Sequence, residues 1–125
     1  ALSQGLPFYS GAITYKIPVN VENGSVEVEA SDYRGGLIAV EVDGEKKGRI
    51  ISPPYNLEIK DLAKGEHEIG IKLYTHRYNS FGPIHLVNEK ESWHGPNAWR
   101  SSGKNWSYEY VLRKTGILKA PVVRL

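Results

Sequence analysis

Leu37-Ile38-Ala39-Val40-Glu41-Val42-Asp43-Gly44 is the stretch that decides the fold, because an apolar strand-like run ends there in a tight turn. Asp-Gly after alternating apolar residues is a strong hairpin signal, since both central positions of a type I′ turn need positive φ. The return strand is expected over residues 48–51. Ser52-Pro53-Pro54 then breaks the pairing, because proline lacks an amide proton and forces the preceding residue out of the helical region.

Working outward from this hairpin, the rest of the chain contains several more extended runs with one solvated face. They alternate apolar and polar residues, which is the period of a half-buried strand. Pro18 marks the first run as an edge strand or its end. Asn23-Gly24 predicts another tight turn, and residues 61–65 predict one helical or bent turn. The further strands are expected at residues 12–19, 26–30, 55–59, 66–73, 108–113 and 121–125.

No window of helical length keeps a 3.6-residue period, so the sequence predicts an all-β fold. Strands of this number with short turns favour a two-sheet antiparallel β-sandwich or jelly roll, which buries its apolar faces between the sheets. The residues expected to point inward are Ile13, Tyr15, Val26, Val28, Ile38, Val40, Val42, Leu57, Ile59, Ile69, Ile71, Leu73, Tyr110 and Leu112.

The order of these pieces resembles the galactose-binding-like jelly roll of glycoside hydrolases. The hairpin at residues 42–48 is similar to a V-N-G-K-x-V-G pattern, with Asp43 in place of the usual Asn. Pro53-Pro54-Tyr55 and Lys64-Gly65-Glu66-His67 follow in the family's order, and residues 79–85 resemble its N-x-x-G-P-H segment. The chain is most similar to the sugar-binding-fold domain of glycoside hydrolase family 2 and to C-terminal modules of large bacterial glycosidases.

This resemblance implies a non-catalytic accessory module that binds carbohydrate, carried by a secreted or periplasmic bacterial glycoside hydrolase. The expected partners are carbohydrate and the catalytic domain of the parent chain. The alternative is a purely structural domain that packs against that catalytic domain without binding sugar. Catalysis by the isolated chain is the third reading. Two carboxylates facing each other would be needed, and the candidates Asp32, Asp61, Glu89 and Glu91 show no such pairing.

Composition excludes several other classes of function. The 125 residues suffice for a single domain over residues 1–125, and the net charge of +2 is too small to argue for binding to nucleic acid or an anionic membrane surface. The chain has no Cys and therefore no disulfide. No apolar run is long enough to span a membrane. The chain also lacks Met and begins at Ala1, from which we expect a module excised from a longer protein.

The irregular stretch at residues 76–107 concentrates the groups that could bind a sugar. Trp106 lies there with two further tryptophans, and a long loop in a compact domain is usually functional or disordered. Tryptophan offers a flat apolar face that suits a pyranose ring. Polar neighbours, including Arg100, could then bind its hydroxyls. The alternative is that the tryptophans close one end of the sandwich or pack on the parent enzyme. The predicted ligand-binding residues are Trp93, Trp99, Arg77, Asn79, His94 and Asn97.

No metal or cofactor is assigned from the sequence. His76, His85 and His94 are spaced by nine residues, whereas zinc sites show short paired spacings. His85 falls in the G-P-H segment, where the expected role is a structural hydrogen bond that shapes the loop. Lectin-like jelly rolls often hold calcium through loop oxygens, but Asp32 and Asp61 are isolated, so calcium ligands stay unknown. Asn-x-Ser triplets begin at Asn23 and Asn105 and fit a glycosylation pattern that arises easily by chance.

Overall fold

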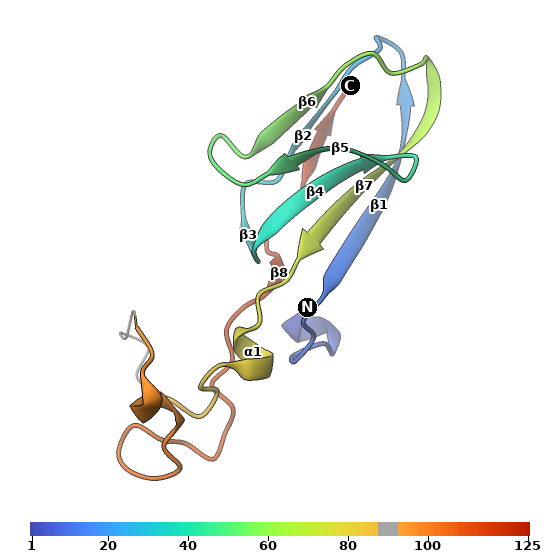
Figure 1. Cartoon of the computed structure of the whole chain (residues 1–125). Coiled ribbons are helices and arrows are strands. Elements are labelled where there is room, and N and C mark those ends of the chain that lie inside the picture. Colours follow the sequence, from blue (N-terminus) through green and yellow to red (C-terminus); the bar gives the residue numbers. More distant parts are fainter. Residues whose placement is uncertain (88–92) are drawn as a thin grey trace. The chain divides into compact units, whose positions relative to one another are not determined.

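The computed structural model describes residues 1–87 and 93–125 and divides the chain into two compact units (Figure 1). We call residues 11–76 and 115–125 the sandwich unit, and residues 1–10 with the described part of 77–114 the aromatic unit. The expected single domain over residues 1–125 stays a prediction, because two such units can belong to one domain.

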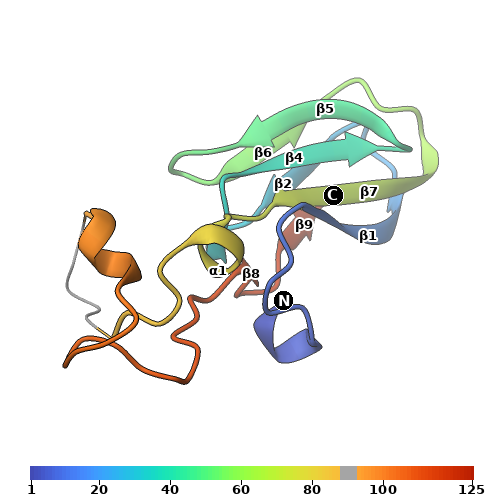
Figure 2. The ribbon, with the colours of Figure 1, turned by 60° about the horizontal axis from the view of Figure 1, so that its bottom comes forward.

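The sandwich unit consists of antiparallel strands in two main layers, which overlap one behind the other in the view of Figure 2. One sheet has the strand order β1-β7-β4-β5 and the other β6-β2-β9, while β3 and β8 form a small ribbon. The predicted all-β sandwich is therefore confirmed. The strands are β1 (Ala12–Val21), β2 (Val26–Glu29), β3 (Tyr33–Arg34), β4 (Leu37–Val42), β5 (Glu45–Ile50), β6 (Asn56–Ile59), β7 (Gly65–Tyr74), β8 (Gly116–Ile117) and β9 (Val122–Arg124).

The β4–β5 hairpin turns as the sequence predicts. Asp43 has φ 52° and Gly44 has φ 83°, so both central residues are left-handed, as a type I′ turn requires. The return strand starts earlier than expected, at Glu45, because Val42 already pairs with Glu45 across the two-residue loop. The register shifts after Val40, which bends the hairpin as β-bulges do.

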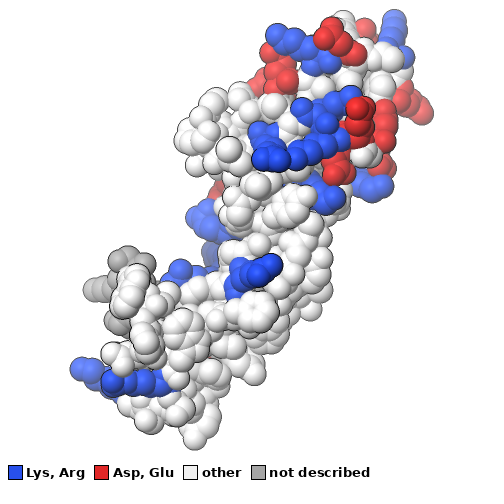
Figure 3. Space-filling model, viewed as in Figure 1, with Lys and Arg blue, Asp and Glu red and all other residues white. Residues whose placement is uncertain are grey.

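Strand β1 lies at the edge of its sheet and pairs only with β7 among the described strands. Pro18 therefore needs no hydrogen-bonding neighbour on its open side, which confirms the edge position. Salt bridges cross the outer faces, with Lys16 Nζ 2.8 Å from Glu68 Oε1 and Arg124 Nη2 2.7 Å from Glu29 Oε2. Charges of both signs cover the face of the sandwich unit drawn in Figure 3.

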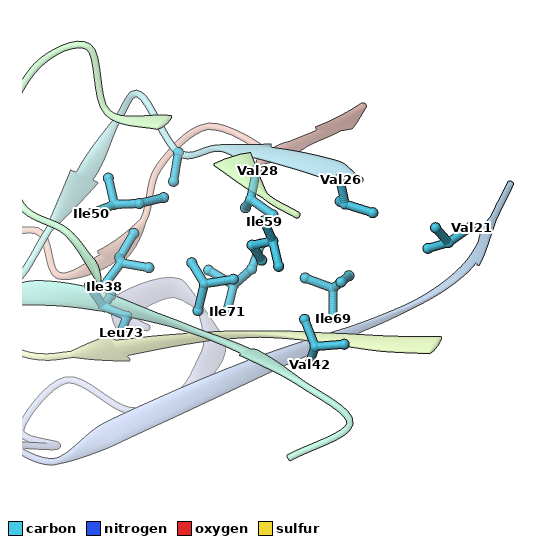
Figure 4. Close-up of a cluster of buried hydrophobic side chains, with 12 residues drawn as sticks. Val21, Val26, Val28, Ile38, Val42, Ile50, Ile59, Ile69, Ile71 and Leu73 are labelled. Carbon is cyan, nitrogen blue, oxygen red and sulfur yellow. The ribbon is translucent and has the colours of Figure 1, made fainter. Parts of the chain in front are cut away.

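The core lies between the two main sheets (Figure 4). Its members come from alternate positions of the strands, as the two-residue period dictates. Most of the predicted inward residues belong to it, while Tyr15 and Leu57 pack on it partly buried. The sequence did not single out Val21, Ala30 and Ile50, which are also buried. The buried cluster is Val21, Val26, Val28, Ala30, Ile38, Val40, Val42, Ile50, Ile59, Ile69, Ile71 and Leu73.

The predicted strand at residues 108–113 is wrong. These residues lie in the aromatic unit and are irregular, and Tyr110 is 58% exposed although it was expected in the core. Leu112 is half-buried and is not part of the core cluster. The only regular elements in the described part of this unit are short helices: η1 (Leu2–Gln4), α1 (Tyr78–Phe81) and η2 (Pro96–Trp99).

Candidate functional site

A short backbone ladder holds the two long loops of the aromatic unit together. Ser107 N donates to His85 O at 2.9 Å, and His85 Nδ1 lies 2.8 Å from Ser107 O. Leu86 pairs with Trp106 in an isolated antiparallel bridge. The expected role of His85, a structural hydrogen bond that shapes the loop, is thereby confirmed.

Aromatic rings extend this ladder into a continuous chain of contacts. The ring centroids of Phe8 and Tyr110 are 5.1 Å apart, and those of Tyr110 and His85 are 5.2 Å apart. His85 then lies 5.9 Å from Trp106, whose ring meets Tyr108 edge to face at 4.4 Å. Contacts of this geometry are favourable beyond the area they bury. They explain why residues 108–110 need no partner strand.

Asn79 and Arg113 form the second fixed point of the unit. Asn79 is 3% exposed, its Nδ2 donates to Arg113 O, and its Oδ1 accepts from Arg113 N, both at 2.8 Å. The Arg113 guanidinium carbon lies 3.9 Å above the Tyr78 ring. Nε2 of His94 is 3.4 Å from Arg113 Nη2. Both polar ends of Asn79 are thus used within the chain, which gives this predicted ligand-binding residue a structural role.

A hollow of about 450 Å³ opens between η2 and the loop that follows it. Gly95 and Pro96 start η2, and proline suits this position because its missing N–H is not needed there. Gly103 has φ 102° and turns the chain back along the hollow. Trp106 forms one half-buried wall. The lining residues are Leu86, Asn97, Ala98, Arg100, Ser102, Gly103, Lys104, Asn105 and Trp106.

The hollow includes only part of the set of residues that the sequence suggested. Asn97 lines it, and its Oδ1 accepts a hydrogen bond from Arg100 Nη2 at 2.8 Å. Trp99 belongs to η2 and is 55% exposed, but it is not among the described lining residues. Trp93 is 77% exposed, and its ring lies against Gly95, where an added Cβ would come within 2.7 Å of it.

The remaining suggested residues lie elsewhere. Arg77 is exposed just before α1, and His94 sits beside Tyr78 and Arg113. Sequence reasoning missed Lys104 and gave Trp106 no particular role. The sequence feature that could have pointed to them is Gly103, because a turn at this glycine brings Lys104 and Trp106 back towards η2.

The acidic residues considered from the sequence lie apart from the hollow or outside the described residues. Asp32 accepts from Arg34 Nη1 at 3.0 Å, and Asp61 is an exposed turn residue with φ 59°. Glu89 and Glu91 lie outside the described residues. No group of three or more potential His, Asp or Glu ligands occurs within residues 1–87 and 93–125. Over the same residues, none of the helices has the length and apolar character needed to cross a bilayer.

A second hollow, of about 460 Å³, lies in the sandwich unit beside His67. His67 Nδ1 is 2.6 Å from Asp43 Oδ2, and this hydrogen bond raises the pKa of His67, with the carbonyl of Ala63 as the next cause. The pKa of Asp43 is lowered, first by the backbone N–H of Glu68 and then by His67. The side chains of Asp43 and His67 are hydrogen-bonded to each other, and Asp43 also accepts from Glu68 N. We therefore assign them a role in holding the hairpin turn and propose no ligand for this hollow.

Comparison with known proteins supports the fold. No protein-family model matches the sequence, and no curated protein matches it. Among solved structures, the chain is similar to part of a rhamnosidase from Novosphingobium sp. PP1Y, with a TM-score of 0.59 and 22% identity. The match covers 93% of this chain and 11% of the rhamnosidase chain. This β-sandwich therefore has the fold of a small segment within a much larger glycoside hydrolase chain.

Proposed function

We propose that this chain is a non-catalytic accessory module of a bacterial glycoside hydrolase and that it binds carbohydrate in the hollow beside η2. The parent enzyme would act in the periplasm or outside the cell. The observation that carries the proposal is the combination of an aromatic wall with amide, hydroxyl and cationic side chains around a hollow of about 450 Å³.

The chemistry of this hollow suits a pyranose ring. One face of such a ring is rich in C–H groups, and the Trp106 ring and the apolar side chains of Leu86 and Ala98 can contact it. The edge of the ring carries hydroxyls, which the amides of Asn97 and Asn105 can bind as donors and acceptors. Small-ligand sites generally combine apolar contact area with a few well-placed polar groups in this way.

Trp99 would extend the binding surface. It directly follows Asn97 and Ala98 in η2, both of which line the hollow, and its ring is exposed. A second sugar unit could stack there while the first occupies the hollow. Trp93 offers a further exposed ring, supported from beneath by Gly95.

Titration of the chain with methyl glycosides, followed by heteronuclear NMR, tests the proposal. We expect saturable shifts at the amides of residues 97–106 and millimolar affinity, roughly 4 kcal/mol, since an open site with one stacked ring gives little more. Asn97→Ala and Trp99→Ala should each weaken binding. Asn20→Ala, which removes another exposed amide in the sandwich unit, serves as the matched control and should bind normally.

A purely structural role is the second candidate, and the exposed rings favour it. Tyr108 is 88% exposed and Phe81 is also exposed, and surfaces rich in exposed aromatic residues commonly mark protein interfaces. Under this alternative, the rings would pack on the catalytic domain of the parent chain. No sugar would then shift the amides of residues 97–106, and Asn97→Ala would behave as the unmodified chain does.

A further inference from the structure

We propose that the hollow beside η2 selects an acidic sugar, a pyranose that carries a carboxylate. This inference rests on the proposed function, because it names the class of sugar for the same site. It starts from the charges that line the hollow. Arg100 and Lys104 both line it, and its described lining contains no Asp or Glu.

The two cations are not neutralised within the part of the chain that the structure describes. Neither Arg100 nor Lys104 forms an ion pair there, and both are exposed. Lys46, Arg49, Lys64 and Lys119 of the sandwich unit likewise form no ion pair with a described residue, so an unpaired cation is not in itself unusual. The hollow is distinguished by two cations in a described lining that contains no Asp or Glu, and an anionic ligand would supply the opposite charge.

Arg100 is also positioned by its neighbour. Its Nη2 donates to Asn97 Oδ1 at 2.8 Å, which restrains the plane of the guanidinium beside the hollow. A guanidinium has five N–H donors in a rigid fork, so donors remain after this bond. The fork matches a planar carboxylate in a two-point contact, which lysine cannot form. Lys104 would contribute as a flexible point charge.

The charge of the rest of the described aromatic unit also favours an anionic ligand. On the face drawn in Figure 3, the described part of the aromatic unit shows blue atoms and no red ones. A surface of one sign attracts ligands of the opposite sign and speeds their association. Glu109 is the acidic residue of the described aromatic unit, and its basic residues are Arg77, Arg100, Lys104, Arg113 and Lys114.

Paired sugars that differ only at carbon 6 test the inference. The methyl glycoside of glucuronic acid, with its carboxylate free, should bind on the order of tenfold more tightly than methyl glucoside at low salt, because charge-assisted hydrogen bonds are about twice as strong as neutral ones. The methyl glycoside of galacturonic acid and methyl galactoside form a second pair. The preference should shrink as salt is added, since exposed charges are screened. Equal affinities within both pairs would overturn the inference and leave the proposed function standing.

Variants assign the effect to the hollow. Arg100→Gln and Lys104→Gln should each reduce affinity for the uronate by a larger factor than affinity for the neutral glycoside, and Arg100→Lys should restore only part of the preference. Lys119→Gln, an exposed cation of the sandwich unit, is the matched control. Competition by acetate at the same concentration as the uronate, or tighter binding of glucose 6-sulfate, would contradict selection of a carboxylated sugar. If neither member of either pair binds, the proposed function fails together with the inference.

Discussion

His67 Nδ1 lies 2.6 Å from Asp43 Oδ2, and this contact joins the start of β7 to the β4–β5 turn. The same carboxylate accepts from Glu68 N through Oδ1 at 2.8 Å, and Asp43 N donates to Glu68 O at 2.9 Å. On the other side of the ring, His67 Nε2 is 2.8 Å from Ala63 O. Both ring nitrogens therefore face acceptors, and only the protonated ring can donate to both.

The first prediction is that the free energy of unfolding depends on pH because of the contact between Asp43 and His67. The raised pKa of His67 means that the folded state holds the proton more tightly than the unfolded state does. Its contribution is fully present below the ordinary histidine value of about 6.5 and is lost as pH rises through the folded pKa. The lowered pKa of Asp43 gives a contribution present above about 3.9 and lost as pH falls.

Urea unfolding between pH 5 and 9 measures this effect. Asp43→Asn should reduce the loss of stability that occurs as pH rises above about 6.5, because Asn retains the turn preference but removes the charge that holds the histidine proton. Glu45→Gln, which changes an exposed acid in the same hairpin, is the control and should keep the original pH profile. Identical profiles for Asp43→Asn and the unmodified chain would contradict the assignment of the proton to His67.

The second prediction concerns Gly44. No heavy atom lies within 4 Å of the position where its Cβ would stand, and its φ is 83°. Gly44→Val should therefore destabilise through backbone strain alone, by about 1–2 kcal/mol or more, since a β-branched residue is poorly tolerated at positive φ. Glu45→Val, on the adjacent exposed strand position, should change the free energy of unfolding far less. Equal stability of the two variants in urea would count against the type I′ turn.

The third prediction compares two glycines that touch neighbouring groups. A Cβ on Gly35 would lie 2.6 Å from the Tyr74 carbonyl oxygen, which is backbone and already accepts from Gly36 N. A Cβ on Gly48 would lie 2.5 Å from Leu57 Cδ2, the flexible end of a side chain. Overpacking typically lowers the free energy of unfolding by roughly 1–3 kcal/mol. Gly35→Ala should lower it more than Gly48→Ala does, because the backbone oxygen cannot move away as a side-chain end can. Thermal unfolding of both variants tests the order, and a larger loss in Gly48→Ala would reverse the reasoning.

The strands were predictable from sequence because each obeys a local rule. Alternation of apolar and polar residues places Ile69 and Ile71 inward, and the requirement for positive φ places the turn at Asp43. The same alternation misled at residues 108–113, where Tyr110 contacts the Phe8 and His85 rings and pairs with none of the described strands. The alternation of apolar and polar residues is a property of one segment. It does not show whether a second segment is available to pair with it.

The candidate hollow was only partly predictable for a related reason. Exposed aromatic residues and polar neighbours were expected between residues 76 and 107, and Asn97 does line the hollow. Lys104 and Trp106 join it through the turn at Gly103 and the Leu86–Trp106 bridge. Neither the turn nor the bridge follows a repeating sequence pattern. Residue spacing therefore does not predict which loop residues contact one another.

The last prediction tests how the aromatic unit is held together. Asn79→Ala removes both hydrogen bonds to the Arg113 backbone, and leaving such groups without partners costs about 1–3 kcal/mol. Amide hydrogen exchange at Arg113 should therefore accelerate. Asn79→Asp is the informative comparison, because an ionised carboxylate still accepts from Arg113 N but cannot donate to Arg113 O, so the acceleration should be smaller. Exchange at Ile71 in β7 should stay slow in both variants, since locally stable units open independently. Equal acceleration at Arg113 and Ile71 would show instead that the two units unfold as one cooperative block, which is the behaviour expected of a single domain.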